Sequence, residues 1–81
     1  MDITENSLKL FLAYAKDSGN WNGQPLVGGN VCILGVKEDR GNLTQLKHAG
    51  LLSTFQSDGY TWIQFSEKGI AFAKEHGVEI L

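Results

Sequence analysis

The segment LTQLKHAGLL, residues 43–52, has the pattern of a helix that passes directly into a strand. Leu43 and Leu46 are three positions apart, and this spacing places both side chains on one face of a helix. Gly50 stands where a glycine commonly ends a helix in a left-handed turn, and two leucines then begin an extended apolar run. We therefore predict a helix over residues 38–49 with both leucines in the core.

A β-hairpin is expected to follow this helix. Residues 51–55 and 60–65 are rich in β-prone side chains, and Ser57-Asp58-Gly59 stands between them. Asp-Gly between two such runs is typical of a tight hairpin turn. Alternation along the second strand predicts that Ile63 and Phe65 face the core. The opposite face of that strand carries Tyr60, Trp62 and Gln64.

A last helix is expected from Glu67 to about His76. Ser66 is placed to cap its first turn, and Gly77 is placed to end it. The residues predicted to face the core are Ile70 and Ala73, with Ala71 and Phe72 alongside.

The N-terminal region predicts a helix that is apolar on more than one face. Thr4 alone, or Asp2 together with Glu5, can cap its first turn. Leu10 and Tyr14 form a second apolar stripe, which is either a wider contact with the core or an interface with a second copy or a partner protein. The first stripe, expected to be buried, consists of Leu8, Phe11, Leu12 and Ala15.

A connector rich in turn residues is predicted over residues 17–29, which contain four glycines and the only proline of the chain. Trp21 in its middle is expected to anchor the connector on the core. The apolar run at residues 31–34 fits either a strand or a short buried helix, and we favour the helix because a further helix follows.

Length and composition favour one folded domain over residues 1–81, since 42% of the side chains are hydrophobic and 20% are charged. Cys32 is the only cysteine, so no internal disulfide can form, and we expect it to be a small buried apolar residue. Cysteines and histidines are also too few for a closed zinc site, and no metal is expected.

The expected location is the cytoplasm. The first five residues carry acidic side chains and no basic region, so no signal peptide is predicted. No apolar run approaches the roughly 18 residues of a membrane span. His48 and His76 fall on different predicted helices without a neighbouring nucleophile. We therefore predict no catalytic residues, no cofactor and no enzyme activity.

Two segments resemble the winged helix-turn-helix superfamily of small bacterial and phage regulators. LTQLKHAGLL at residues 43–52 resembles a recognition helix that runs into the first wing strand. IQFSEKGIAFA at residues 63–73 is similar to the segment that leaves the wing and opens the last helix. The resemblance implies an α+β fold with a three-helix core, a two- or three-stranded β-hairpin wing and a C-terminal helix. Asp58, at the expected wing tip, stands where DNA-binding wings usually carry a basic residue.

The resemblance also implies that the helix over residues 38–49 enters the major groove of duplex DNA. Gly41 would allow the helix backbone to approach the DNA closely. The residues that would read base edges are Thr44, Gln45 and His48, with Asn42 at the margin. The residues that would contact phosphates are Lys37, Arg40 and Lys47.

The net charge of −2 is unusual for a DNA-binding domain, and two functions are therefore expected. The first is a DNA-binding transcriptional regulator that acts as a dimer, because so few basic residues favour binding to paired half-sites. The second is a protein-interaction module, for example a phage or plasmid protein that docks on a host complex. The interface residues expected for such a module are Leu10, Tyr14, Tyr60 and Trp62.

Overall fold

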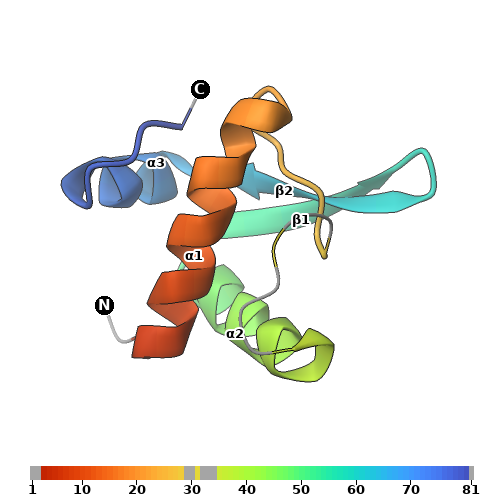
Figure 1. Cartoon of the computed structure of the whole chain (residues 1–81), viewed down its shortest axis with the longest axis horizontal. Coiled ribbons are helices and arrows are strands. Elements are labelled where there is room, and N and C mark those ends of the chain that lie inside the picture. Colours follow the sequence, from red (N-terminus) through yellow and green to blue (C-terminus); the bar gives the residue numbers. More distant parts are fainter. Residues whose placement is uncertain (1–2, 29–30, 32–34, 81) are drawn as a thin grey trace.

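The computed structural model describes residues 3–28, 31 and 35–80, and this part of the chain is an α+β fold. It has three α-helices, one two-stranded antiparallel sheet and a 3₁₀ turn at Ser18–Asn20. The helix α1 crosses the middle of the molecule, and the hairpin projects away from the helices (Figure 1). The predicted α+β class is confirmed. The elements are α1 (Glu5–Asp17), α2 (Val36–His48), β1 (Leu52–Ser57), β2 (Tyr60–Phe65) and α3 (Glu67–Glu75).

The helix ends follow the local signals in the sequence. Thr4 caps α1, and its Oγ1 accepts a hydrogen bond at 3.1 Å from the N–H three residues on. Ser66 caps α3 in the same way at 3.0 Å. Gly50 and Gly77 end α2 and α3 with φ of 77° and 80°, and the N–H groups of these turns bond back to the last carbonyls of each helix. The predicted caps are thus confirmed, although α2 begins at Val36, two residues earlier than predicted.

The buried face of α1 is rotated relative to the prediction. Leu10 and Tyr14 are only 0% and 2% exposed, so both belong to the core. Their interpretation as a dimer or partner interface is wrong, and the wider core contact is the one observed. Leu8 and Leu12, predicted to be buried, are instead partly exposed. The residues of α1 that form the core are Leu10, Phe11, Tyr14 and Ala15.

The hairpin has a two-residue turn at Asp58 and Gly59, whose φ values of 55° and 79° are typical of a type I′ turn. This turn pairs β1 with β2 in the register that places Leu52 opposite Phe65. Ile63 and Phe65 face the core, as predicted. β1 begins one residue later and ends two residues further along than expected.

A short segment of the connector runs antiparallel along the free edge of β2. Leu26 forms an isolated bridge with Trp62. The N–H of Val27 and the carbonyl of Pro25 each hydrogen-bond to β2 at 2.9 Å. Residues 25–27 therefore extend the two-stranded sheet on this side without forming a full strand.

The two ends of the hairpin meet at one point, which we call the hairpin base (residues 49–51 and 66–69). Ser66 Oγ donates a hydrogen bond to the Gly50 carbonyl at 2.6 Å, and its N–H donates to the Leu51 carbonyl at 3.1 Å. Lys68 Nζ donates to the Ala49 carbonyl at 3.0 Å. The base therefore joins the end of α2 to the start of α3.

The helix α3 approaches the hairpin base more closely than its sequence suggests. A Cβ atom on Gly69 would lie 1.9 Å from the Leu51 carbonyl oxygen, so only glycine fits at this contact. Gly69 and Ala73 are buried. Ile70, predicted to face the core, is 42% exposed, because the glycine side of the helix occupies the contact instead. That part of the prediction is wrong.

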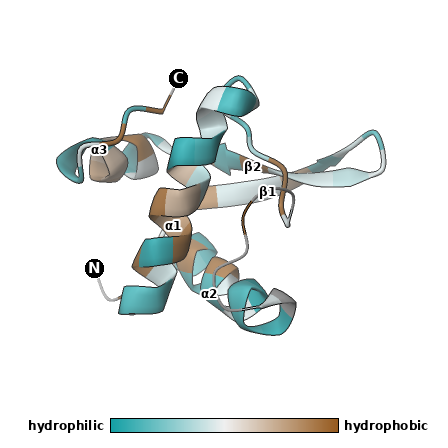
Figure 2. Cartoon of the chain, viewed as in Figure 1, coloured by the Kyte–Doolittle hydropathy of each residue, from teal (hydrophilic) through white to brown (hydrophobic). Residues whose placement is uncertain are grey.

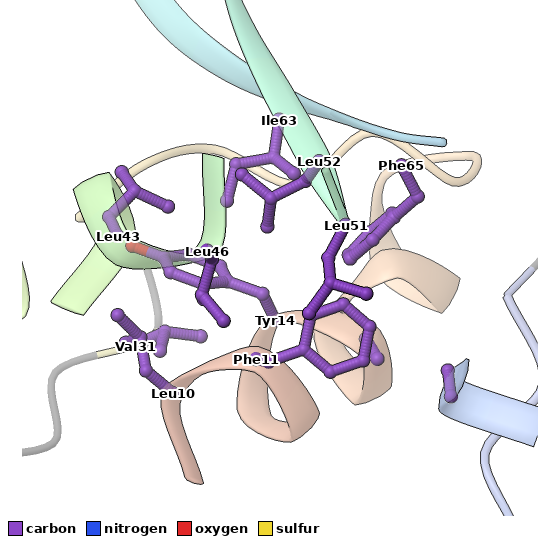
Figure 3. Packing of buried hydrophobic residues seen from close by; sticks show 12 residues of the cluster. Leu10, Phe11, Tyr14, Val31, Leu43, Leu46, Leu51, Leu52, Ile63 and Phe65 are labelled. Atoms are coloured by element: carbon purple, nitrogen blue, oxygen red, sulfur yellow. The ribbon is translucent and has the colours of Figure 1, made fainter. Parts of the chain in front are cut away.

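The core lies where α1, α2 and the hairpin converge (Figure 3). Leu43 and Leu46 point into it from α2, as predicted, and are 7% and 0% exposed. Phe11 of α1 lies edge-on to Phe65 and Phe72, with ring centroids 5.7 and 5.4 Å apart. Hydropathy follows this arrangement, since the outer surface of α2 is mostly hydrophilic and its inner side apolar (Figure 2).

Trp21 anchors the connector between α1 and the sheet. Its indole N–H donates to Asp17 Oδ2 at 3.0 Å, and its ring contacts Trp62 with centroids 5.5 Å apart. Trp21 does anchor the connector, as predicted, but on the end of α1 and the hairpin; the predicted contact with the core is not observed. Val31 is buried. Cys32 and the remainder of the predicted short helix lie outside the described residues.

Candidate functional site

Most of the predicted DNA-contacting residues lie on the exposed side of α2, which we call the free face. At about 100° per residue, these residues span a continuous arc of about 120° on the half of the helix opposite Leu43 and Leu46. All of them are exposed to solvent. The free face consists of Lys37, Arg40, Gly41, Thr44, Lys47 and His48.

Charge is distributed unevenly around α2. The three basic side chains of the helix lie on the free face, whereas its two acidic side chains do not. Glu38 bends back to the start of the helix, where its Oε2 lies 2.9 Å from the position of a Cβ on Gly35. Asp39 is 8% exposed and lies on the core side. All charged side chains on the arc of the free face are therefore basic, and the acidic Asp39 lines the same pocket as Arg40.

Lys68 brings a fourth cation to the C-terminal end of α2. Its ammonium group donates to the Ala49 carbonyl at 3.0 Å, where the helix dipole favours positive charge. Lys68 was not predicted as a site residue, because it lies 19 residues further along the chain than its acceptor. The only local signal was the Ser-Glu-Lys-Gly run at residues 66–69, whose Ser66 and Lys68 hydrogen-bond to the carbonyls that follow α2.

Two uncharged residues lie among these cations. Thr44 donates its hydroxyl proton to the Arg40 carbonyl at 3.0 Å within the helix, so its oxygen can still accept a hydrogen bond from outside. A Cβ on Gly41 would meet nothing within 4 Å, which leaves the helix backbone open to close approach. Both residues are where the prediction requires them.

Asn42 and Gln45 are directed toward α1 and away from the free face. Gln45 Oε1 accepts a hydrogen bond at 2.8 Å from the N–H of Thr4, and Asn42 Oδ1 accepts one at 3.2 Å from Ser7 Oγ. The side-chain oxygens that were expected to face base edges thus join α2 to the start of α1. The start of a helix has free N–H groups that need acceptors. Which side chain supplies the acceptor depends on tertiary packing, so the sequence alone did not indicate Gln45.

Replacing Gln45 with alanine should lower the free energy of unfolding by about 1 kcal/mol, because the Thr4 N–H loses its acceptor. Gln45→Glu should preserve stability, since a carboxylate still accepts this bond and is favourable beside a helix N-terminus. Urea unfolding followed by circular dichroism measures both. Equal losses for the two variants would contradict the role of the acceptor oxygen.

Aromatic side chains gather on the outer face of the hairpin. Tyr60 is 59% exposed, and Trp62 beside it is half-buried. Phe55 stands directly opposite Trp62 in the register, and Trp21 of the connector contacts the Trp62 ring. Two of the four predicted interface residues, Tyr60 and Trp62, are therefore on the surface together.

Within residues 3–28, 31 and 35–80, no group of three or more His, Cys, Asp or Glu side chains could hold a metal ion. None of the helices in this part of the chain is both long and apolar enough to cross a membrane. His48 lies on the free face, while the Nδ1 of His76 lies 2.9 Å from the Phe72 carbonyl. No known protein family, curated protein or solved structure gives a significant match to the chain.

Proposed function

We propose that this chain is a winged-helix domain that binds duplex DNA, with the free face of α2 in the major groove. The order of elements supports this proposal: a helix, a connector with a sheet-edge segment, a second helix, a hairpin and a last helix. An α-helix with its side chains is about as wide as the major groove, which is roughly 12 Å across.

The observation that carries the proposal is the separation of charge on α2. Lys37, Arg40 and Lys47 surround Thr44 on the free face, while the acidic side chains of the helix lie elsewhere. In this arrangement the cations contact phosphates, and Thr44 is placed to touch a base edge. Asn42 and Gln45 hydrogen-bond to the start of α1 instead. Fewer side chains are therefore proposed to contact base edges than the sequence indicated.

The number of cations predicts the strength of binding. Four basic groups per copy, including Lys68, give a slope of log K against log salt of about −3 to −4 for each bound copy. Asp58 at the hairpin tip adds no phosphate contact. Such a site binds weakly as a monomer, and we propose that two copies bind paired half-sites about one helical turn apart.

A labelled random duplex titrated at several salt concentrations tests this proposal by fluorescence anisotropy. Arg40→Ala and Lys47→Ala should each weaken binding to all sequences and reduce the salt slope by about 1. Lys16→Ala is the matched control, since it removes the same charge from the last turn of α1, remote from α2 (Figure 1). Absence of binding at low salt, or an equal loss for the control, would overturn the proposal.

A further inference from the structure

A recess of about 300 Å³ lies between the connector and the outer face of the hairpin, on elements that the proposed DNA contact does not use. The connector side is fixed by the hydrogen bonds of residues 25–27 to β2 and by the indole N–H of Trp21. The recess is therefore built from two segments that are already held together. Its lining residues are Asn20, Trp21, Asn22, Gln24, Phe55, Ser57, Asp58 and Trp62.

The aromatic rings of the recess stand at steep angles to one another. The Trp21 and Trp62 planes differ by 64°, with centroids 5.5 Å apart. Tyr60, which does not line the recess, lies beside Trp62 with its plane at 73° to the indole. Both indole N–H groups already have acceptors, Asp17 Oδ2 for Trp21 and the Ser57 carbonyl for Trp62, each at 3.0 Å. The rings are thus fixed in place and offer their faces and edges, not their donors, to a ligand.

The polar side chains that line the recess are three amides, the Ser57 hydroxyl and the Asp58 carboxylate. Asp58 is exposed at the turn, and the Asp17 carboxylate lies behind Trp21, bonded to both Trp21 and Asn20. None of the described lining residues is a lysine, an arginine or a histidine. The charged side chain that lines the recess is therefore acidic, which favours a cation and disfavours a phosphate.

We propose that this recess binds an arginine side chain of a partner protein. A guanidinium stacks on aromatic faces and at the same time donates paired hydrogen bonds to a carboxylate, which matches the rings and Asp58. A guanidinium is smaller than a sugar or a nucleobase, and it carries the positive charge that the Asp58 carboxylate attracts. Arginine binding in the recess does not depend on DNA binding, because the recess is acidic and lies on the connector and the hairpin, whereas the proposed DNA contact is basic and lies on α2.

The two tryptophans of the chain both line the recess, so intrinsic fluorescence reports binding there directly. The probe is the blocked tripeptide acetyl-Gly-Arg-Gly-amide, titrated against the full chain. Half-saturation is expected on the order of 1 mM, as befits one side chain. The neutral isostere acetyl-Gly-citrulline-Gly-amide should bind at least about fivefold more weakly, since it lacks the charge that the rings and Asp58 attract.

Asp58→Asn removes the carboxylate charge without disturbing the turn. Asparagine tolerates the left-handed backbone at this position and suits the first position of a type I′ turn. It should weaken arginine binding about threefold or more and leave the thermal midpoint unchanged. Glu75→Gln, an exposed site on α3, removes the same charge elsewhere and should change neither. Equal affinity for arginine and citrulline, no effect of Asp58→Asn, or tighter binding of methyl glucoside or adenosine monophosphate would each overturn the proposal.

Discussion

Gly69→Ala is expected to lower the free energy of unfolding by about 3 kcal/mol or more, the upper range for an overpacked site. The added Cβ would lie 1.9 Å from the Leu51 carbonyl oxygen and 2.9 Å from its carbon. Both are backbone atoms in a fully buried residue, and this carbonyl also accepts the Ser66 N–H, so neither can move aside cheaply. An 81-residue domain has a total stability of about 4–12 kcal/mol, so the variant should lose roughly a quarter to three quarters of it and unfold at a clearly lower temperature.

Gly41→Ala is the matched control for this substitution. It lies inside α2, where a Cβ meets nothing within 4 Å, and alanine is favoured over glycine in a helix by about 1 kcal/mol. Urea unfolding should therefore give Gly41→Ala a higher free energy of unfolding than the natural protein and Gly69→Ala a much lower one. A loss of less than about 1 kcal/mol for Gly69→Ala would show that α3 does not approach the hairpin base this closely.

Phe11→Ala is expected to cost about 3–5 kcal/mol of unfolding free energy. Phe11 is fully buried and contacts both Phe65 at the end of β2 and Phe72 in α3. Its removal leaves a cavity at the point where α1 meets these two elements, and the rings that remain lose their edge-on partner. Thermal or urea unfolding measures the loss.

Leu12→Ala on the adjacent position of α1 serves as the control for Phe11. Leu12 is only partly buried at the margin of the core, so about 1 kcal/mol is expected, less than for a full core truncation. Comparable losses at the two positions would mean that α1 is rotated back toward the face predicted from its sequence.

Local signals identified most of the element boundaries. Asp58-Gly59 can adopt the two left-handed conformations that a type I′ turn requires, and this fixed the hairpin and the inward direction of Ile63 and Phe65. Gly50 and Ser66 acted in the same way at the end of α2 and the start of α3. Such signals depend on a few neighbouring atoms, which is why they can be read from the chain alone.

The errors arose where the choice depended on tertiary contact. Apolar residues surround more than half of α1, so periodicity alone did not decide whether Leu8 or Leu10 faced the core. In α3, Gly69 contributes no hydrophobic signal, yet its lack of a side chain decides which face packs, and Ile70 turns outward.

The candidate site was predictable where it depended on local spacing and not where it depended on tertiary contacts. The cations and Thr44 on α2 followed from helical spacing relative to Leu43 and Leu46. The hydrogen bonds of Asn42 and Gln45 to α1 did not follow, because polar side chains carry no marker of the partner they will meet. Lys68 was missed because a contact over 19 residues requires knowledge of the fold.

The closed hairpin base constrains how the length of this chain can change. Ser66 and Lys68 at the start of α3 donate hydrogen bonds to the carbonyls of residues 49–51 at the end of α2. With both strand ends held in this way, an extra residue in one strand must either form a β-bulge or slide one strand against the other. A slip of one residue would turn the inward side chains outward. Residues added at the tip in matched pairs, one on each strand, would lengthen the hairpin and leave both the base and the separation of the helices unchanged.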